Sequence, residues 1–161
     1  MSDHSHLDEA GHPRMVDVGP KAVTKRYARA GCIIVLGPEL LCQLKEKGFQ
    51  NKKGSILTTA ILAGIMAAKQ TSSLIPLCHP LPLDKCNVKI EPEGDHSLKV
   101  ECECSTSSRT GVEMEALTGA SVAALTVYDM CKAVNPAIEI TTLRLEEKRG
   151  GKSDFFPTQA S

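Results

Sequence analysis

The order in which two hydrophobic periods follow each other along the chain constrains its fold more than any other feature. Apolar and small side chains recur at every second position over residues 21–36, which predicts a long strand. Helical patterns follow over residues 38–47 and 56–70. Alternation returns over residues 86–90 and 98–104, a long helical pattern covers residues 112–134, and an imperfect alternation over residues 138–147 predicts a strand with a bulge.

The capping and turn residues between these segments agree with the predicted helices and strands. Pro38 suits the first turn of a helix, Ser55 suits an N-cap, and Asn135-Pro136 ends the long helix. A turn is expected at residues 92–95 and a polar loop at residues 105–111. When the two adjacent helices are counted as one, the order is βαββαβ. The sequence therefore predicts an α+β, ferredoxin-like fold, with an antiparallel sheet and helices on one face.

The chain length of 161 residues suits one domain, which we expect over residues 14–154. Residues 1–13 are polar and rich in histidine, and we expect a disordered tail there. Residues 155–161 are expected to form a C-terminal tail. The first residues are acidic rather than arginine-rich, so neither a signal peptide nor a transit peptide is expected.

Composition excludes some partner classes. Nineteen Lys and Arg residues balance nineteen Asp and Glu residues, which argues against nucleic acid or an anionic membrane as a partner. No apolar run is long enough to span a membrane. The seven cysteines are odd in number and include no Cys-x-x-Cys motif, so we expect reduced, intracellular thiols that pack as small hydrophobic side chains.

Ionisable residues inside apolar stretches mark three candidate parts of a site. They lie in the segments Leu77–Leu81, Gly111–Thr118 and Tyr128–Lys132. An unpaired buried charge costs several kcal/mol, as an order of magnitude, and local folding rules give no reason to place three such groups in one small chain. A binding or catalytic site is a reason.

Asp129 and Lys132 are three residues apart on the predicted long helix and therefore share a face. They form either a structural ion pair or a catalytic pair, and partial burial would lower the pKa of the lysine. Glu115 and Asp129 are fourteen residues apart, so they stand about 21 Å apart along the helix. Either they serve different parts of a large ligand, or two subunits combine at a shared site.

The other two groups also allow two interpretations. Prolines on both sides fix the backbone around His79, which suits an oriented ligand contact or a structural side chain. Cys78 and His79 make a weak metal pair because two further ligands at zinc spacing are missing, so no metal site is expected. Glu113 and Glu115 suit either the helix dipole or a ring edge rich in hydrogen-bond donors.

Basic residues near turns are candidates for binding phosphate. Lys53 precedes a helix N-terminus, where it binds an anion or is merely solvated. Arg26 lies on an apolar strand face, and a guanidinium binds two oxygens of a phosphate at once, in a bidentate manner. The run Lys148–Ser153 looks like a P-loop, but Glu146 replaces the first glycine and no helix can follow. We expect this run to be a flexible basic arm.

Together these motifs resemble the cyclic pyranopterin monophosphate synthase family of molybdenum cofactor biosynthesis, also called MoaC. The resemblance covers nearly all of residues 14–154. The matching segments are Met15–Val18, Lys53-Gly54, Leu77–Leu81, Gly111–Thr118 and Tyr128–Ala133. One departure is that the family's tail carries a glycine between Ser and Asp, whereas Asp154 directly follows Ser153 here.

The resemblance implies an activity and a set of site residues. The substrate would be a cyclised dihydro-GTP, 3',8-cyclo-7,8-dihydroguanosine 5'-triphosphate, and the products would be cyclic pyranopterin monophosphate and pyrophosphate. The implied catalytic residues are Lys53, Asp129 and Lys132. The implied substrate-binding residues are Arg26, Leu77, Cys78, His79, Glu113, Met114, Glu115, Lys148 and Lys152.

The resemblance also implies a homo-hexamer, a trimer of dimers with sites at the dimer interface. It requires no cofactor, although Mg²⁺ would be able to accompany the triphosphate. The expected location is the cytoplasm, or the mitochondrial matrix if the chain comes from a eukaryotic fusion. Two other classes remain: a regulatory module that binds without turnover, and a metal-dependent hydrolase that uses Cys78, His79 and carboxylates.

Overall fold

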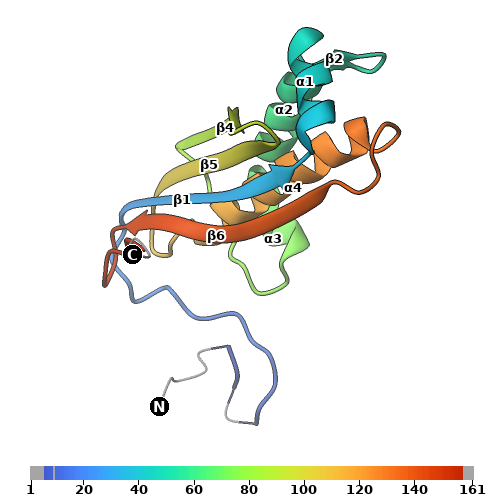
Figure 1. Ribbon diagram of the computed structural model, residues 1–161. Coiled ribbons are helices and arrows are strands. Elements are labelled where there is room, and N and C mark those ends of the chain that lie inside the picture. The colour runs from blue at the N-terminus through green and yellow to red at the C-terminus, as the bar shows by residue number, and fades with distance from the viewer. Residues whose placement is uncertain (1–5, 9, 158–161) are drawn as a thin grey trace.

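Four long strands form one antiparallel sheet in the computed structural model, which describes residues 6–8 and 10–157 (Figure 1). They are β1 (Thr24–Val35), β4 (Lys85–Glu93), β5 (Ser97–Ser108) and β6 (Glu139–Arg149), in the spatial order β4-β5-β1-β6. Helices α2 (Ile56–Lys69) and α4 (Glu113–Cys131) pack on each other and on one face of this sheet. The predicted ferredoxin-like α+β fold is confirmed.

Smaller elements lie at the two ends of the helical layer. Helix α1 (Pro38–Glu46) and a two-stranded hairpin, β2 (Gln50–Asn51) with β3 (Gly54–Ser55), lie at one end, and α3 (Thr71–Leu74) lies at the other (Figure 1). Pro38 begins α1, and the hydroxyl of Ser55 accepts a hydrogen bond from the Thr58 amide at 3.3 Å, so both predicted helix starts are confirmed.

The core lies between the sheet and the helices. On β1 the alternate residues Ala28, Ala30, Cys32 and Ile34 are buried, as the sequence period predicts. Helices α2 and α4 approach each other closely at two glycines. A Cβ on Gly64 would lie 2.8 Å from the carbonyl oxygen of Gly119, which is closer than real contacts allow. Small residues therefore set the spacing of the helix layer.

The ends of two strands differ from the sequence prediction. Strand β5 continues to Ser108 instead of giving way to a loop at residue 105, because the polar residues 105–108 pair with the start of β1. Strand β4 continues to Glu93, so the turn begins at Gly94. The predicted bulge in the last strand is confirmed, because the pairing of β1 with β6 shifts twice and Thr142 has a positive φ of 52°.

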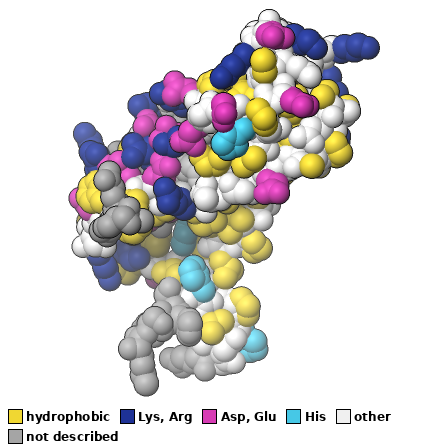
Figure 2. All heavy atoms as spheres, in the orientation of Figure 1, with side chains coloured by type: hydrophobic (Ala, Val, Ile, Leu, Met, Phe, Trp, Pro, Cys, Tyr) yellow, Lys and Arg dark blue, Asp and Glu magenta, His cyan; other side chains and the backbone are white. Residues whose placement is uncertain are grey.

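The sheet face away from the helices carries charges of both signs, which Figure 2 shows intermingled over the strands. At its centre the Arg29 guanidinium lies 3.2 Å from Glu146 and 3.4 Å from Glu147. Within residues 6–8 and 10–157, no helix is both long enough and apolar enough to cross a membrane. The tail predicted for residues 1–13 falls partly outside the described residues, and Leu7 bridges Pro13 within it.

Candidate functional site

A cavity of about 450 Å³ lies at the N-terminal end of α4. It brings together two of the three groups singled out in the sequence, Leu77–Leu81 and Gly111–Thr118, with Lys152 from the C-terminal arm. The predicted site residues that line it are Leu77, Cys78, His79, Glu113, Met114, Glu115 and Lys152. The connection between α3 and β4 supplies the first three, and the first turn of α4 supplies the glutamates.

Burial sets the chemistry of this cavity. Glu115 is only 4% exposed, and it makes no ion pair with any residue that the structure describes. Burial raises the pKa of its carboxyl group, and the neighbouring charge of Glu113 adds to the effect. The pKa of the Cys78 thiol is likewise raised, first by burial and then by Glu115. A buried carboxylate without a cation is suited to accept hydrogen bonds from a ligand.

Glu113 has a different partner. Its carboxylate lies 3.2 Å from the Lys148 ammonium, and both side chains are about one-third exposed. Gly111 lies so close to this carboxylate that a Cβ there would collide with it. The ion pair joins the start of α4 to the end of β6 and thereby fixes one wall of the cavity.

A second cavity, of about 420 Å³, adjoins the first and shares Lys21, Thr110, Gly111 and Lys152 with it. Its lining is strongly basic. The charged residues are Lys21, Arg26, Arg109, Lys148 and Lys152. Five cationic groups around one opening, without a carboxylate in its lining, suit an extended polyanion.

Arg26 is a half-buried lining residue of this basic cavity. Its Nη2 donates a hydrogen bond to the carbonyl oxygen of Arg109 at 3.4 Å, while its Nε is buried and has no partner among the described residues. Gly151 packs directly on the guanidinium, with a positive φ of 84°, and any Cβ there would collide with it. The guanidinium is therefore held in place by Arg109 and Gly151 at the basic cavity.

The C-terminal arm forms a defined hairpin rather than the flexible arm predicted from the sequence. Lys148 and Phe155 exchange two backbone hydrogen bonds, of 3.0 and 2.9 Å, and the Asp154 carboxylate accepts a hydrogen bond from the Gly150 amide at 2.9 Å. Phe155, which was predicted to begin a tail, is thus paired with β6. Although Asp154 directly follows Ser153, without the glycine that the family carries between them, Lys152 still lines both cavities.

Sequence reasoning missed two cationic residues of the site. Lys21 is the first residue of the predicted strand and Arg109 lies within the predicted polar loop, so neither stands out from an ordinary solvated side chain. The structure brings them together through a hydrogen bond from Nε of Arg109 to the carbonyl oxygen of Lys21 at 3.1 Å. Arg109 is revealed only by the folded chain, in which it directly follows β5 and its carbonyl oxygen accepts a hydrogen bond from Arg26.

Lys53, Asp129 and Lys132 form a separate cluster at the C-terminal end of α4. The Asp129 carboxylate lies 2.7 Å from the Lys132 ammonium and 3.4 Å from the Lys53 ammonium. All three side chains are more than half exposed: Lys53 is 62% exposed, Asp129 54% and Lys132 53%. The hydrogen bond from Lys132, followed by the two lysine charges, lowers the pKa of Asp129.

The prediction that burial lowers the pKa of Lys132 is wrong. The side chain is exposed, and its hydrogen bond with Asp129 raises its pKa instead. In the single chain, therefore, the cluster consists of charged groups in solvent.

The β2–β3 hairpin places Lys53 against α4. The side-chain amide of Asn51 donates a hydrogen bond to the carbonyl oxygen of Met130 at 2.9 Å, and its oxygen accepts one from the Lys53 amide at 2.8 Å. These bonds tie the tip of the hairpin to the end of the helix. Without them, the Lys53 side chain would have no fixed relation to Asp129.

Comparison with known proteins identifies the chain's relatives. Residues 15–151 match the MoaC family. The chain is 51% identical over 155 residues to the cyclic pyranopterin monophosphate synthase of Xanthomonas oryzae pv. oryzae, which covers 96% of this chain and 94% of that protein. It is 52% identical to that of Xanthomonas campestris pv. campestris, covering 94% and 92%. It is 51% identical to cyclic pyranopterin monophosphate synthase 3 of Mycobacterium tuberculosis, covering 97% and 89%.

Proposed function

The chain belongs to the MoaC family, and we propose that it is a cyclic pyranopterin monophosphate synthase of molybdenum cofactor biosynthesis. It converts 3',8-cyclo-7,8-dihydroguanosine 5'-triphosphate into cyclic pyranopterin monophosphate and releases pyrophosphate. The observation that carries the proposal is the pair of adjoining cavities at the start of α4. One is basic and suits a triphosphate, and the other ends in a buried carboxylate and suits a guanine-derived ring.

The triphosphate lies in the basic cavity. Arg26 holds phosphate oxygens through its Nη groups, and Lys148 and Lys152 approach from the C-terminal hairpin. Lys21 and Arg109 add two further cations. Mg²⁺ bound to the triphosphate is compatible with this arrangement, because the phosphates themselves would supply oxygen ligands.

The ring lies in the cavity that contains Leu77, His79 and Glu115. The purine-derived ring presents N–H groups along one edge, and the Glu115 carboxylate accepts hydrogen bonds from them. Leu77 and Met114 supply apolar contact with its faces. Glu113 remains paired with Lys148 and orients that lysine toward the phosphates.

Lys53, Asp129 and Lys132 move the protons. The ring must open and close again as a pterin, and each step needs a proton to leave one atom and reach another. Asp129 accepts a hydrogen bond from each lysine, so a proton passing between the ligand and one lysine is balanced by the adjacent carboxylate. In the last step a sugar hydroxyl oxygen attacks the innermost phosphorus, and the bond from that phosphorus to the pyrophosphate leaving group breaks.

Two subunits build each site. Asp129 lies about 21 Å along α4 from Glu115, which is farther than one compact pocket extends. A homodimer that brings the C-terminal end of one α4 to the cavity of its partner solves this geometry. Exposed Leu62 and Met66 on α2 and Leu125 on α4 provide apolar surface for association, and we propose a hexamer built as a trimer of such dimers. We place the enzyme in the cytoplasm.

An activity assay tests the proposal. Purified protein is incubated with the cyclised dihydro-GTP, and both pyrophosphate and the fluorescent oxidised pterin are measured. We expect both products together in wild type and neither in Lys132→Ala. If the protein binds the substrate but forms neither product, it is a regulatory module rather than a synthase. If the purified protein contains one metal ion per chain and loses its activity when a chelator removes that ion, a metal-dependent hydrolase is favoured.

A further inference from the structure

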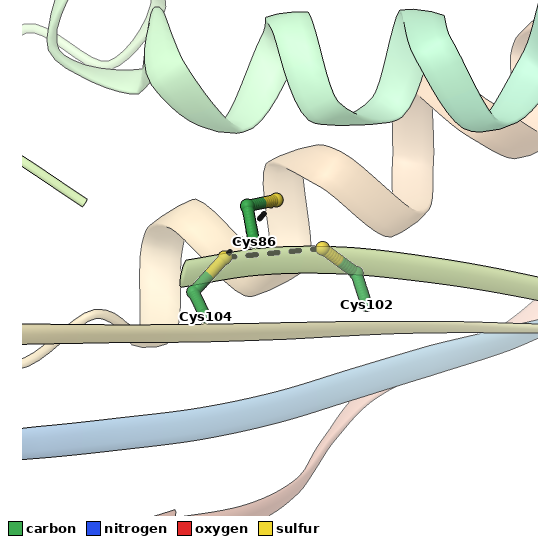
Figure 3. A group of neighbouring side chains, drawn as sticks. All are labelled: Cys86, Cys102 and Cys104. Carbon is green, nitrogen blue, oxygen red and sulfur yellow. Dashed lines mark hydrogen bonds between the residues drawn. The ribbon is translucent and has the colours of Figure 1, made fainter. Parts of the chain in front are cut away.

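Three thiols that the proposed reaction does not use converge between the sheet and the helices. Cys102 and Cys104 lie two residues apart on β5 and point to the same face, and Cys86 on β4 is the cross-strand partner of Cys104 (Figure 3). The sulfur of Cys104 lies 3.7 Å from that of Cys86 and 3.9 Å from that of Cys102. All three sulfur atoms lie within 4.8 Å of one another.

These distances match the edges of a three-coordinate thiolate site. A metal–sulfur bond of about 2.3 Å in a flat triangle separates the sulfur atoms by about 4 Å. The three sulfurs therefore need only small side-chain rotations to share one ion. Among the residues that the structure describes, no other group of three His, Cys, Asp or Glu ligands comes together in this way.

The surroundings favour a soft ion of low coordination number. Cys102 and Cys104 are at most 1% exposed, and Cys86 is half-buried. Helix α4 leaves room above Cys102 only because Gly119 lies there, since a Cβ would come 2.5 Å from the sulfur. No oxygen or nitrogen ligand belongs to the group. Thiolates bind Cu(I), zinc and iron–sulfur clusters, but structural zinc sites and these clusters use four ligands, so a group of three thiols favours Cu(I).

One thiol provides an entry for the ion. Cys86 is half-buried, whereas Cys102 and Cys104 are fully buried, and the positive charge of Lys69 acts on Cys86. A cation therefore meets Cys86 first, and binding to all three sulfur atoms releases the protons of the thiols to solvent. Lys69 offsets part of the negative charge of the resulting site.

We propose that Cys86, Cys102 and Cys104 form a three-sulfur binding site for Cu(I), separate from the substrate cavities. This site is independent of the proposed synthase reaction, because none of its residues lines either cavity. The ion is held by β4 and β5 and covered by the helical layer.

Titration of the full chain with Cu(I), under anaerobic conditions and after reduction of all thiols, tests this site. Cu(I) is supplied from a competing bicinchoninate complex. We expect one tightly bound ion per chain, with X-ray absorption showing three sulfur neighbours at about 2.3 Å. Cys86→Ser should weaken this binding by more than about 100-fold, because it removes a direct ligand. Cys42→Ser, which changes an exposed thiol on α1, should leave it unchanged.

Thermal unfolding supplies a second readout that does not depend on turnover. Cu(I) should raise the Tm of wild type and of Cys42→Ser, but not that of Cys86→Ser. Circular dichroism of the Cys86→Ser protein checks that it folds, which is expected because the position is half-buried. Absence of binding in wild type, equal binding in Cys86→Ser, or a preference for Zn(II) with a fourth ligand would each overturn the proposal.

Discussion

The two ends of α4 present opposite solutions to the placement of charge. At the N-terminal end, Glu115 is buried without a cation and the pKa of its carboxyl group is raised. At the C-terminal end, Asp129 lies in solvent between two lysines and its pKa is lowered. The first arrangement lines a cavity. The second is an exposed cluster of one carboxylate and two ammonium groups that encloses no cavity of its own.

Under the proposed function, this difference means that the single chain supplies two half-sites. Asp129 and its lysines attract each other through water, which weakens their interaction and leaves proton transfer uncoupled from any substrate. Covering the cluster with a second subunit would remove that water and strengthen the same contacts. Mutations at each end of α4 test whether the exposed cluster is catalytic and whether the cavity binds the substrate.

Replacing the central carboxylate should produce the largest effect on activity. We expect Asp129→Asn to lower kcat by about 10²–10⁴-fold, because the amide can no longer balance a proton on either lysine. Its Tm should change by less than about 2 °C, since the side chain is exposed. Steady-state kinetics and thermal unfolding measure the two quantities.

Lys45→Ala, on the exposed surface of α1, serves as a control that removes a lysine without touching the cluster. It should keep wild-type kcat. If Asp129→Asn retains most of its activity, the cluster is a structural ion pair and the comparison between the two ends loses its functional meaning.

Mixed oligomers should recover part of that loss. Arg26→Ala disables a cavity and Asp129→Asn disables a cluster, so the two variants are combined by co-expression with different affinity tags. If each site takes its cavity from one subunit and its cluster from the other, random pairing restores about one quarter of the wild-type rate, since half of the dimers are mixed and each has one intact site. Each variant alone is the control, and a mixture no more active than their average would place the whole site within one chain.

Sequence reasoning reached the fold and most of the first cavity for definite physical reasons. The period of two on β1 and the capping signals at Pro38 and Ser55 are local, so each is visible without knowing the fold. The polar extension of β5 to Ser108 was missed because its stability comes from pairing with β1, which no local pattern encodes. Lys21 and Arg109 were missed for the same reason.

The three clustered cysteines show which part of a site a local sequence pattern can predict. Cys102 and Cys104 alternate on one strand, so their shared face follows from the sequence alone. Cys86 joins them only through the register of β4 against β5. The exposure of Lys132 was also beyond local reasoning, because it depends on which faces of α4 the sheet and α2 leave uncovered.

A methyl group at Gly151 should have an intermediate effect, confined to the phosphate end. Gly151→Ala forces a Cβ against the Arg26 guanidinium and displaces it from the basic cavity. We expect KM to rise about 10-fold with a smaller change in kcat, because phosphate binding is lost in ground state and transition state alike.

Gly94→Ala is the matched control. Gly94 also has a positive φ, of 66°, but a Cβ there meets nothing within 4 Å. Both variants therefore carry similar backbone strain, and only Gly151→Ala contacts a site residue. An equal rise of KM in the two variants would assign the effect to general destabilisation rather than to Arg26.

The smallest expected effect is on stability and depends on pH. Burial raises the pKa of Glu115 above its ordinary value of 4.5, so the folded state holds the proton more tightly than the unfolded state does. The resulting stabilisation is complete below pH 4.5 and is lost as pH rises through the raised pKa. Glu115→Gln removes this dependence, and its Tm should exceed that of wild type by about 2–4 °C at pH 7. At pH 4 the two Tm values should converge.

Glu113→Gln is the control, because it changes the neighbouring glutamate and breaks its ion pair with Lys148. It should lower the Tm slightly at pH 7. Thermal unfolding between pH 4 and pH 7 separates the effects of the two glutamates. A lower Tm for Glu115→Gln than for wild type at pH 7 would mean that the Glu115 carboxylate already has a stabilising partner. The contrast between the two ends of α4 would then be lost.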